Sequence, residues 1–81
     1  MKYQVLKKLK TKNKLLKLCD TIEEAKEVLK QTGARFNGLS YIGNFPTFMD
    51  DKRTIYSIQG RVEGYGIVCS IPQKEVEQFT Y

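Results

Sequence analysis

The stretch DTIEEAKEVLKQTG, residues 20–33, decides the fold because it carries a complete set of helix signals. Thr21 suits an N-cap whose hydroxyl accepts from the amide of Glu24, and Glu24 can reach back to Thr21 in a capping box. Gly33 provides a left-handed stop at the other end. We therefore expect a helix over residues 21–32. Its apolar positions recur at helical spacing on one face: Ile22, Ala25, Val28, Leu29 and Thr32.

The apolar face of that helix must pack against another part of the chain, because a helix of about three turns does not persist alone in water. The preceding chain predicts a hairpin, with strands at residues 2–9 and 14–19 joined by a loop at residues 10–13. A single helix over residues 1–19 fits less well, since its apolar side chains would scatter around its surface. Apolar and polar residues alternate imperfectly along the first strand, and a bulge near residues 7–8 would restore the alternation.

The chain after the helix begins with a segment rich in glycine, asparagine and aromatic residues, 34–48. We interpret it as an ordered loop that contains one short strand at residues 39–42. A polar turn follows at residues 50–53. Two further segments have the β-branched and aromatic composition typical of strands, residues 54–59 and 65–71. The second of these is the most apolar run in the chain, which favours a central strand.

The end of the chain predicts a turn and a short helix. The turn between the last two strands lies at either Gly60-Arg61 or Glu63-Gly64, and the sequence does not choose between them. Pro72 ends the last strand and suits the first position of a helix over residues 73–79. Two apolar side chains of that helix are expected to face inward: Val76 and Phe79.

The element order is thus ββα, then ββ or βββ, then α. It predicts an α+β fold in a single domain, residues 1–81, with a small antiparallel sheet and the helix at residues 21–32 packed on one face. The content of 41% hydrophobic and 28% charged residues is ordinary for a folded domain. With no export signal or apolar span, we expect a cytoplasmic protein in which Cys19 and Cys69 are reduced thiols.

The positive charge belongs to one segment. Residues 1–19 hold seven lysines and no acid, whereas residues 20–81 hold seven basic and nine acidic groups, so +7 and −2 make the net +5. A localised excess of this kind is typical of an electrostatic binding surface. We assign nucleic-acid binding to the hairpin lysines Lys7, Lys8, Lys10, Lys12, Lys14 and Lys17. The segment has no arginine, which favours charge neutralisation over base-specific recognition. Protection of an exposed strand edge would also explain lysines here.

Aromatic residues supply a second set of candidates. Most of the nine aromatic side chains are needed for the core of so small a domain. Those in the irregular loop are the ones we expect to be exposed, where they could stack on bases or enter a pocket of a protein partner, and Tyr65 is a further candidate for the same role. These partner or stacking candidates are Tyr41, Phe45, Phe48 and Tyr65.

Much catalytic chemistry is excluded. The sequence has no histidine, which removes the commonest general base and metal ligand. Asp50-Asp51 indicates a solvated turn rather than a cation site. The glycines of GRVEGYG, residues 60–66, precede a strand, whereas a phosphate-binding loop precedes a helix. We expect no catalytic residue, no metal site and no cofactor, and therefore not an enzyme.

Our first hypothesis is a small, non-enzymatic, basic binding module that contacts nucleic acid or a nucleoprotein through the N-terminal hairpin. The alternative is a protein-interaction module or inhibitor that uses loop aromatics or a strand edge. A third possibility is a homo-oligomer that binds an anionic nucleotide. No membrane partner is expected.

Overall fold

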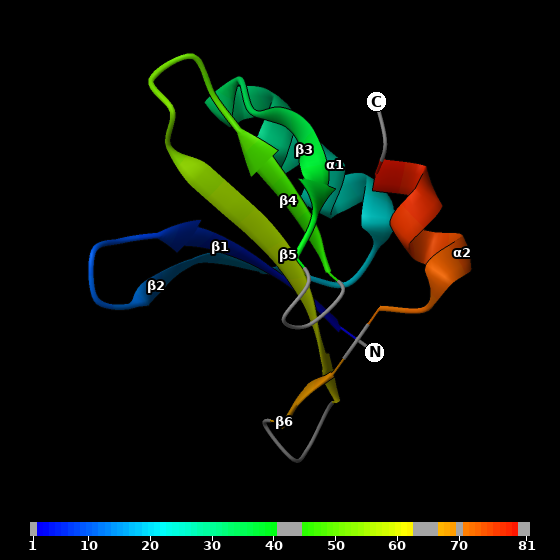
Figure 1. Ribbon diagram of the computed structural model, residues 1–81. Coiled ribbons are helices and arrows are strands. Elements are labelled where there is room, and N and C mark those ends of the chain that lie inside the picture. The colour runs from blue at the N-terminus through cyan, green and yellow to red at the C-terminus, as the bar shows by residue number, and fades with distance from the viewer. Residues whose placement is uncertain (1, 41–44, 63–66, 70, 80–81) are drawn as a thin grey trace.

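One antiparallel sheet with helices on one face organises this chain, and the predicted α+β class is confirmed (Figure 1). The computed structural model describes residues 2–40, 45–62, 67–69 and 71–79. In these residues the strand order is β2-β1-β5-β4-β3, and β6 pairs with the last part of β5. The elements are β1 (Lys2–Lys8), β2 (Asn13–Cys19), α1 (Ile22–Thr32), β3 (Arg35–Leu39), β4 (Pro46–Met49), β5 (Ile55–Val62), β6 (Ile67–Cys69), α2 (Gln73–Val76) and η1 (Glu77–Phe79).

Helix α1 begins and ends where its sequence predicts. The hydroxyl of Thr21 accepts a hydrogen bond from the backbone amide of Glu24 at 3.2 Å. Gly33 has φ 79°, and its amide donates to the carbonyl of Lys30 at 3.1 Å. This left-handed conformation suits glycine and closes the last turn. The apolar stripe lies against the sheet, with Ala25 and Leu29 fully buried.

The core lies between one face of the sheet and both helical segments. Four rings form an edge-to-face row across it, with centroid distances of 6.4 Å for Tyr3–Phe79, 6.2 Å for Phe79–Phe48 and 6.0 Å for Phe48–Phe36. The hydroxyl of Tyr3 also donates to the carboxylate of Glu75 in α2. The row fixes the C-terminal segment on the same face as α1, and the inward orientation predicted for its two apolar residues, Val76 and Phe79, is confirmed.

The hairpin forms as predicted, but its bulge lies elsewhere. Pairing runs from Tyr3↔Cys19 to Val5↔Lys17 and then shifts to Leu6↔Leu15. The extra residue is therefore Leu16 on the second strand, and the bulge predicted near residues 7–8 is wrong. A bulge changes which residues share a face. Here it lets Leu16 pack against the core, while Leu15 is turned to the other side and is 46% exposed.

The segment predicted to be a loop contributes more strand than expected. Residues 46–49 form β4, so the described part of the chain has four strands after α1, where two or three were predicted. The short strand predicted at residues 39–42 is displaced, because β3 ends at Leu39 and Ser40 is not in a strand; residues 41–44 fall outside the described part. Gly60 and Arg61 lie inside β5, so a turn there is wrong; the other predicted position, Glu63-Gly64, lies outside the described residues.

Candidate functional site

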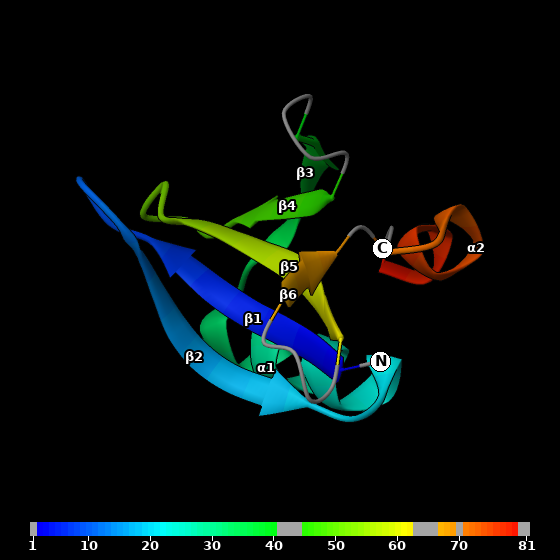
Figure 2. The same ribbon diagram turned by 90° about the horizontal axis from the view of Figure 1, so that it is seen from below.

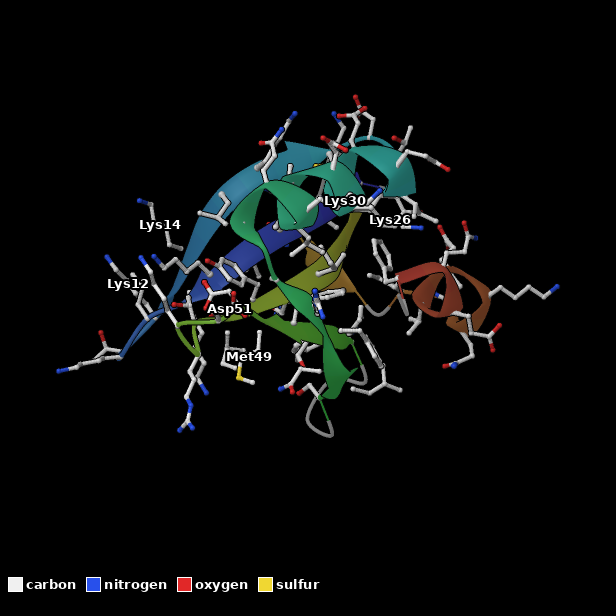
Figure 3. The ribbon with its side chains drawn as sticks, turned by 90° about the horizontal axis from the view of Figure 1, so that it is seen from above. Lys12, Lys14, Lys26, Lys30, Met49 and Asp51 are labelled. Atoms are coloured by element: carbon white, nitrogen blue, oxygen red, sulfur yellow. The ribbon has the colours of Figure 1, made fainter. Side chains whose placement is uncertain are left out.

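The tip of the β1–β2 hairpin gathers most of the predicted lysines. The amide of Leu9 donates to the carbonyl of Lys12 at 2.8 Å and closes the loop. Lys7 pairs across the hairpin with Lys14, and Lys8 pairs with Asn13. Five of the six predicted lysines thus lie at or next to the tip: Lys7, Lys8, Lys10, Lys12 and Lys14. All of these except the half-buried Lys7 are exposed, and Lys12 and Lys14 are labelled in Figure 3.

The tip lysines surround the hairpin and do not form a stripe on one face. Side chains alternate between the two faces along a strand. Because Tyr3 and Val5 lie in the core, Lys7 points to the α1 side and Lys8 to the opposite side. Lys17 is exposed but stands opposite Val5, away from the tip. The cluster is therefore accessible from several directions.

A second turn adds a cation that the sequence did not reveal. The β4–β5 turn lies at the same end of the sheet as the hairpin tip (Figures 1 and 2). Arg53 in this turn lines a shallow hollow together with Lys8, Lys10 and Ile55. The proximity follows from the pairing of β5 with β1, in which Lys7 stands opposite Tyr56. A prediction that β5 pairs with β1 would therefore have identified Arg53 as a neighbour of the tip lysines.

Asp50 holds this turn in place. Its Oδ1 accepts from the amides of Lys52 and Thr54, both at 2.9 Å, and its Oδ2 accepts from the hydroxyl of Tyr56 at 3.1 Å. The bond from the Thr54 amide is the main cause that lowers the pKa of Asp50, while burial raises the pKa of Tyr56. The carboxylate therefore organises the turn. No group of three metal-ligating side chains gathers anywhere in the described residues.

The sheet face opposite α1 contains a small hollow. The hollow has a volume of about 250 Å³, and its lining comes from β1, β2, β4, β5 and the residues next to β3 and β4: Lys8, Asn13, Ser40, Phe45, Thr47, Ile55, Ser57 and Gln59. Asn13 starts β2, and Ser40 follows β3, which are the two outer strands of the main sheet. Since both reach one hollow, this face of the sheet is concave.

The predicted aromatic candidates are separated by the fold. Phe48 was expected to be exposed in a loop, and this is wrong: it lies in β4, is 0% exposed and packs between Phe36 and Phe79. A ring in that position cannot stack on a base while the core is intact. Phe45 is half-buried and lines the 250 Å³ hollow. Tyr41 and Tyr65 lie outside the described residues.

Cys19 lies in the core. It is 0% exposed, and burial raises its pKa, while Lys17 acts in the opposite direction. The backbone register places Cys19, Tyr3, Gly60 and Cys69 in one row across β2, β1, β5 and β6. Cys19 and Cys69 are thus three strand spacings apart, which corresponds to about 14 Å between their backbones. A disulfide requires Cα atoms within about 7 Å, so this register rules out a bridge between the two cysteines.

No protein-family model, curated protein or solved structure matches this chain. Among the helices of the described residues, none has the length and apolar character needed to cross a membrane.

Proposed function

We propose that this protein is a small, non-enzymatic binding module that contacts nucleic acid or a nucleoprotein through the hairpin tip. One observation carries the proposal: five lysines and Arg53 gather at one end of the sheet. None of these six groups forms an ion pair with a carboxylate in the described part of the chain. Uncompensated like charges repel one another, and a polyanion relieves that repulsion while releasing its own counterions.

Protection of a strand edge explains only part of this charge. The outer strand β2 carries Lys14 and Lys17, which suffice to discourage edge-to-edge pairing. Lys7 and Lys8 lie on β1, which is paired on both sides by β2 and β5. The loop lysines, Lys10 and Lys12, belong to no edge at all. The surplus charge therefore favours a phosphate-binding role.

The proposal is tested by fluorescence anisotropy of labelled single- and double-stranded DNA and RNA across a salt series. Six phosphate contacts correspond to a log–log salt slope of about −4 for a single strand and about −5 for a duplex. Changing Lys8, Lys10, Lys12 and Lys14 to serine should remove most binding without unfolding the protein, because all four are exposed. Unchanged affinity in this variant refutes the proposal.

A matched pair of double variants separates the position of charge from its amount. K10Q/K12Q removes two lysines from the tip, and K30Q/K74Q removes two exposed lysines from the helices. Both lower the net charge equally. The tip variant should lose about 1.4 from the single-strand salt slope, while the helix variant should keep the slope of the unmodified protein. Equal losses would mean that only net charge matters.

A second candidate function is protein binding through the edge of β2. The observation that favours it is the exposure of Leu15 and Leu18, at 46% and 38%, on an outer strand. An added strand could pair with this edge and cover both leucines. Sedimentation of the protein before and after Leu15→Thr and Leu18→Thr tests whether a second copy uses it. The variants should abolish any self-association that depends on this edge.

A further inference from the structure

We propose that the 250 Å³ hollow on the concave sheet face receives one unpaired base of a single-stranded nucleic acid. This inference rests on the proposed function and extends it by naming the substrate class. The hollow and the basic tip share a wall, because Lys8 and Ile55 line both the 250 Å³ hollow and the hollow beside Arg53. A strand whose phosphates lie at the tip can therefore place an adjacent base in the hollow without leaving the protein surface.

The lining has the groups that recognise a base. Phe45 supplies an aromatic ring, on which any base can stack. Ser57 and Gln59 supply hydrogen-bonding groups, and neither side chain bonds to another residue in the described part of the chain. The Thr47 hydroxyl donates to the carbonyl of Gly38 at 2.9 Å, so it offers a fixed acceptor. Such groups match the donors and acceptors on base edges.

Charge and composition favour a nucleotide over a peptide. Of the eight described side chains that line the hollow, two are apolar, whereas grooves that bind peptide helices or proline-rich segments are mainly apolar or aromatic. The described residues that line the hollow include no carboxylate, and Lys8 at its rim suits the phosphate of the bound nucleotide. Asp20 lies beyond the far end of β2, where it forms an ion pair with Lys2 at 3.1 Å.

Size and shape exclude a paired base. The hollow is smaller than the roughly 300–1,000 Å³ typical of small-molecule sites, which suits one planar ring. A concave surface cannot enter a groove of a duplex, as a helix or a protruding ribbon does. A base reaches such a hollow only when it is unstacked and unpaired, as in single-stranded segments.

The test compares two labelled oligonucleotides of equal length and charge. One is oligothymidylate, and the other has the same backbone with abasic sites in place of the bases. The unmodified protein should bind oligothymidylate roughly 5- to 150-fold more tightly, which is the contribution expected of one stacked base. Phe45→Ala and Ser57→Val should each reduce this preference and leave binding of the abasic strand unchanged. Retained binding of the abasic strand also shows that each variant is folded.

A matched control is Leu39→Ala, which removes an apolar side chain that is 41% exposed and does not line the hollow. This variant should keep the preference for oligothymidylate. Equal affinity of the unmodified protein for the two strands would overturn the base site and leave the phosphate-binding tip intact. Absence of binding to either strand at low salt would overturn the proposed function itself.

Discussion

Replacing Arg53 with glycine should stabilise this protein and weaken its binding of nucleic acid at the same time. Among the described non-glycine residues, Arg53 has the positive φ, 64°. A residue with a Cβ in this left-handed region loses roughly 1–2 kcal/mol relative to the right-handed one. The strain sits in a turn that brings a cation beside Lys8 and Lys10, and local strain of this kind is often retained at functional sites.

The expected magnitude follows from comparing glycine with alanine at this position. Glycine removes the Cβ strain of about 1–2 kcal/mol, but its greater freedom in the unfolded chain costs about 0.5–1 kcal/mol. Arg53→Gly should therefore be more stable than Arg53→Ala by about 1 kcal/mol. In a domain of this size that difference corresponds to about 4–8 °C in Tm. Both variants lose the same cation, so both should lower the single-strand salt slope by about 0.7.

Thermal unfolding followed by circular dichroism, together with anisotropy across a salt series, measures both effects. Lys52 is the matched control, because it is a basic neighbour whose φ is not positive. Lys52→Gly should be less stable than Lys52→Ala, which is the reverse order. If Arg53→Gly is no more stable than Arg53→Ala, the strain argument is refuted. If neither Arg53 variant changes the salt slope, Arg53 does not contact phosphate.

Three further predictions concern the fold. Hydrogen bonds lower the pKa of Asp50, so its contribution to stability is present above pH ~4 and is lost as pH falls through the lower pKa of the folded state. The urea midpoint of unfolding should therefore decline less in acid for Asp50→Asn than for the unmodified protein. Phe79→Ala should cost about 3–5 kcal/mol in urea unfolding, and a loss below about 1 kcal/mol would contradict the packing of that ring. In a Cys69→Ser background, Cys19 should react with a thiol reagent only as fast as the protein opens, whereas immediate labelling would show that it is accessible.

Local signals explain which parts of the fold could be predicted from the sequence. The bounds of α1 depend on Thr21 and Gly33, which act on backbone groups within a few residues of themselves. Strand β4 depends on partners distant in the sequence: Phe48 pairs with Phe36 on one side and Tyr56 on the other. A four-residue segment that begins with proline has little strand character alone. It becomes a strand because β3 and β5 pair with it on both sides.

The same distinction applies to the candidate site. The lysines could be found because they are concentrated in one segment of the sequence. Arg53 could not, since its place beside Lys8 requires that β5 pair with β1, which is more than forty residues away in the chain. Predicting the hollow would require still more information, because residues at the ends of both outer strands line it. The curvature of the sheet, which brings these residues together, cannot be read from the sequence pattern.

The distribution of charge also suggests how a nucleic acid would approach this protein. Helix α1 carries three glutamates and two lysines, and the segment formed by α2 and η1 carries two glutamates and one lysine, so each is net acidic. Glu23 and Glu24 are placed where they stabilise the start of α1 through the helix dipole. In the proposed complex they have a second effect, because negative charge on the helical side repels phosphates. A strand drawn to the hairpin tip would then extend over the concave sheet face, where the base site is proposed, and not over the helices.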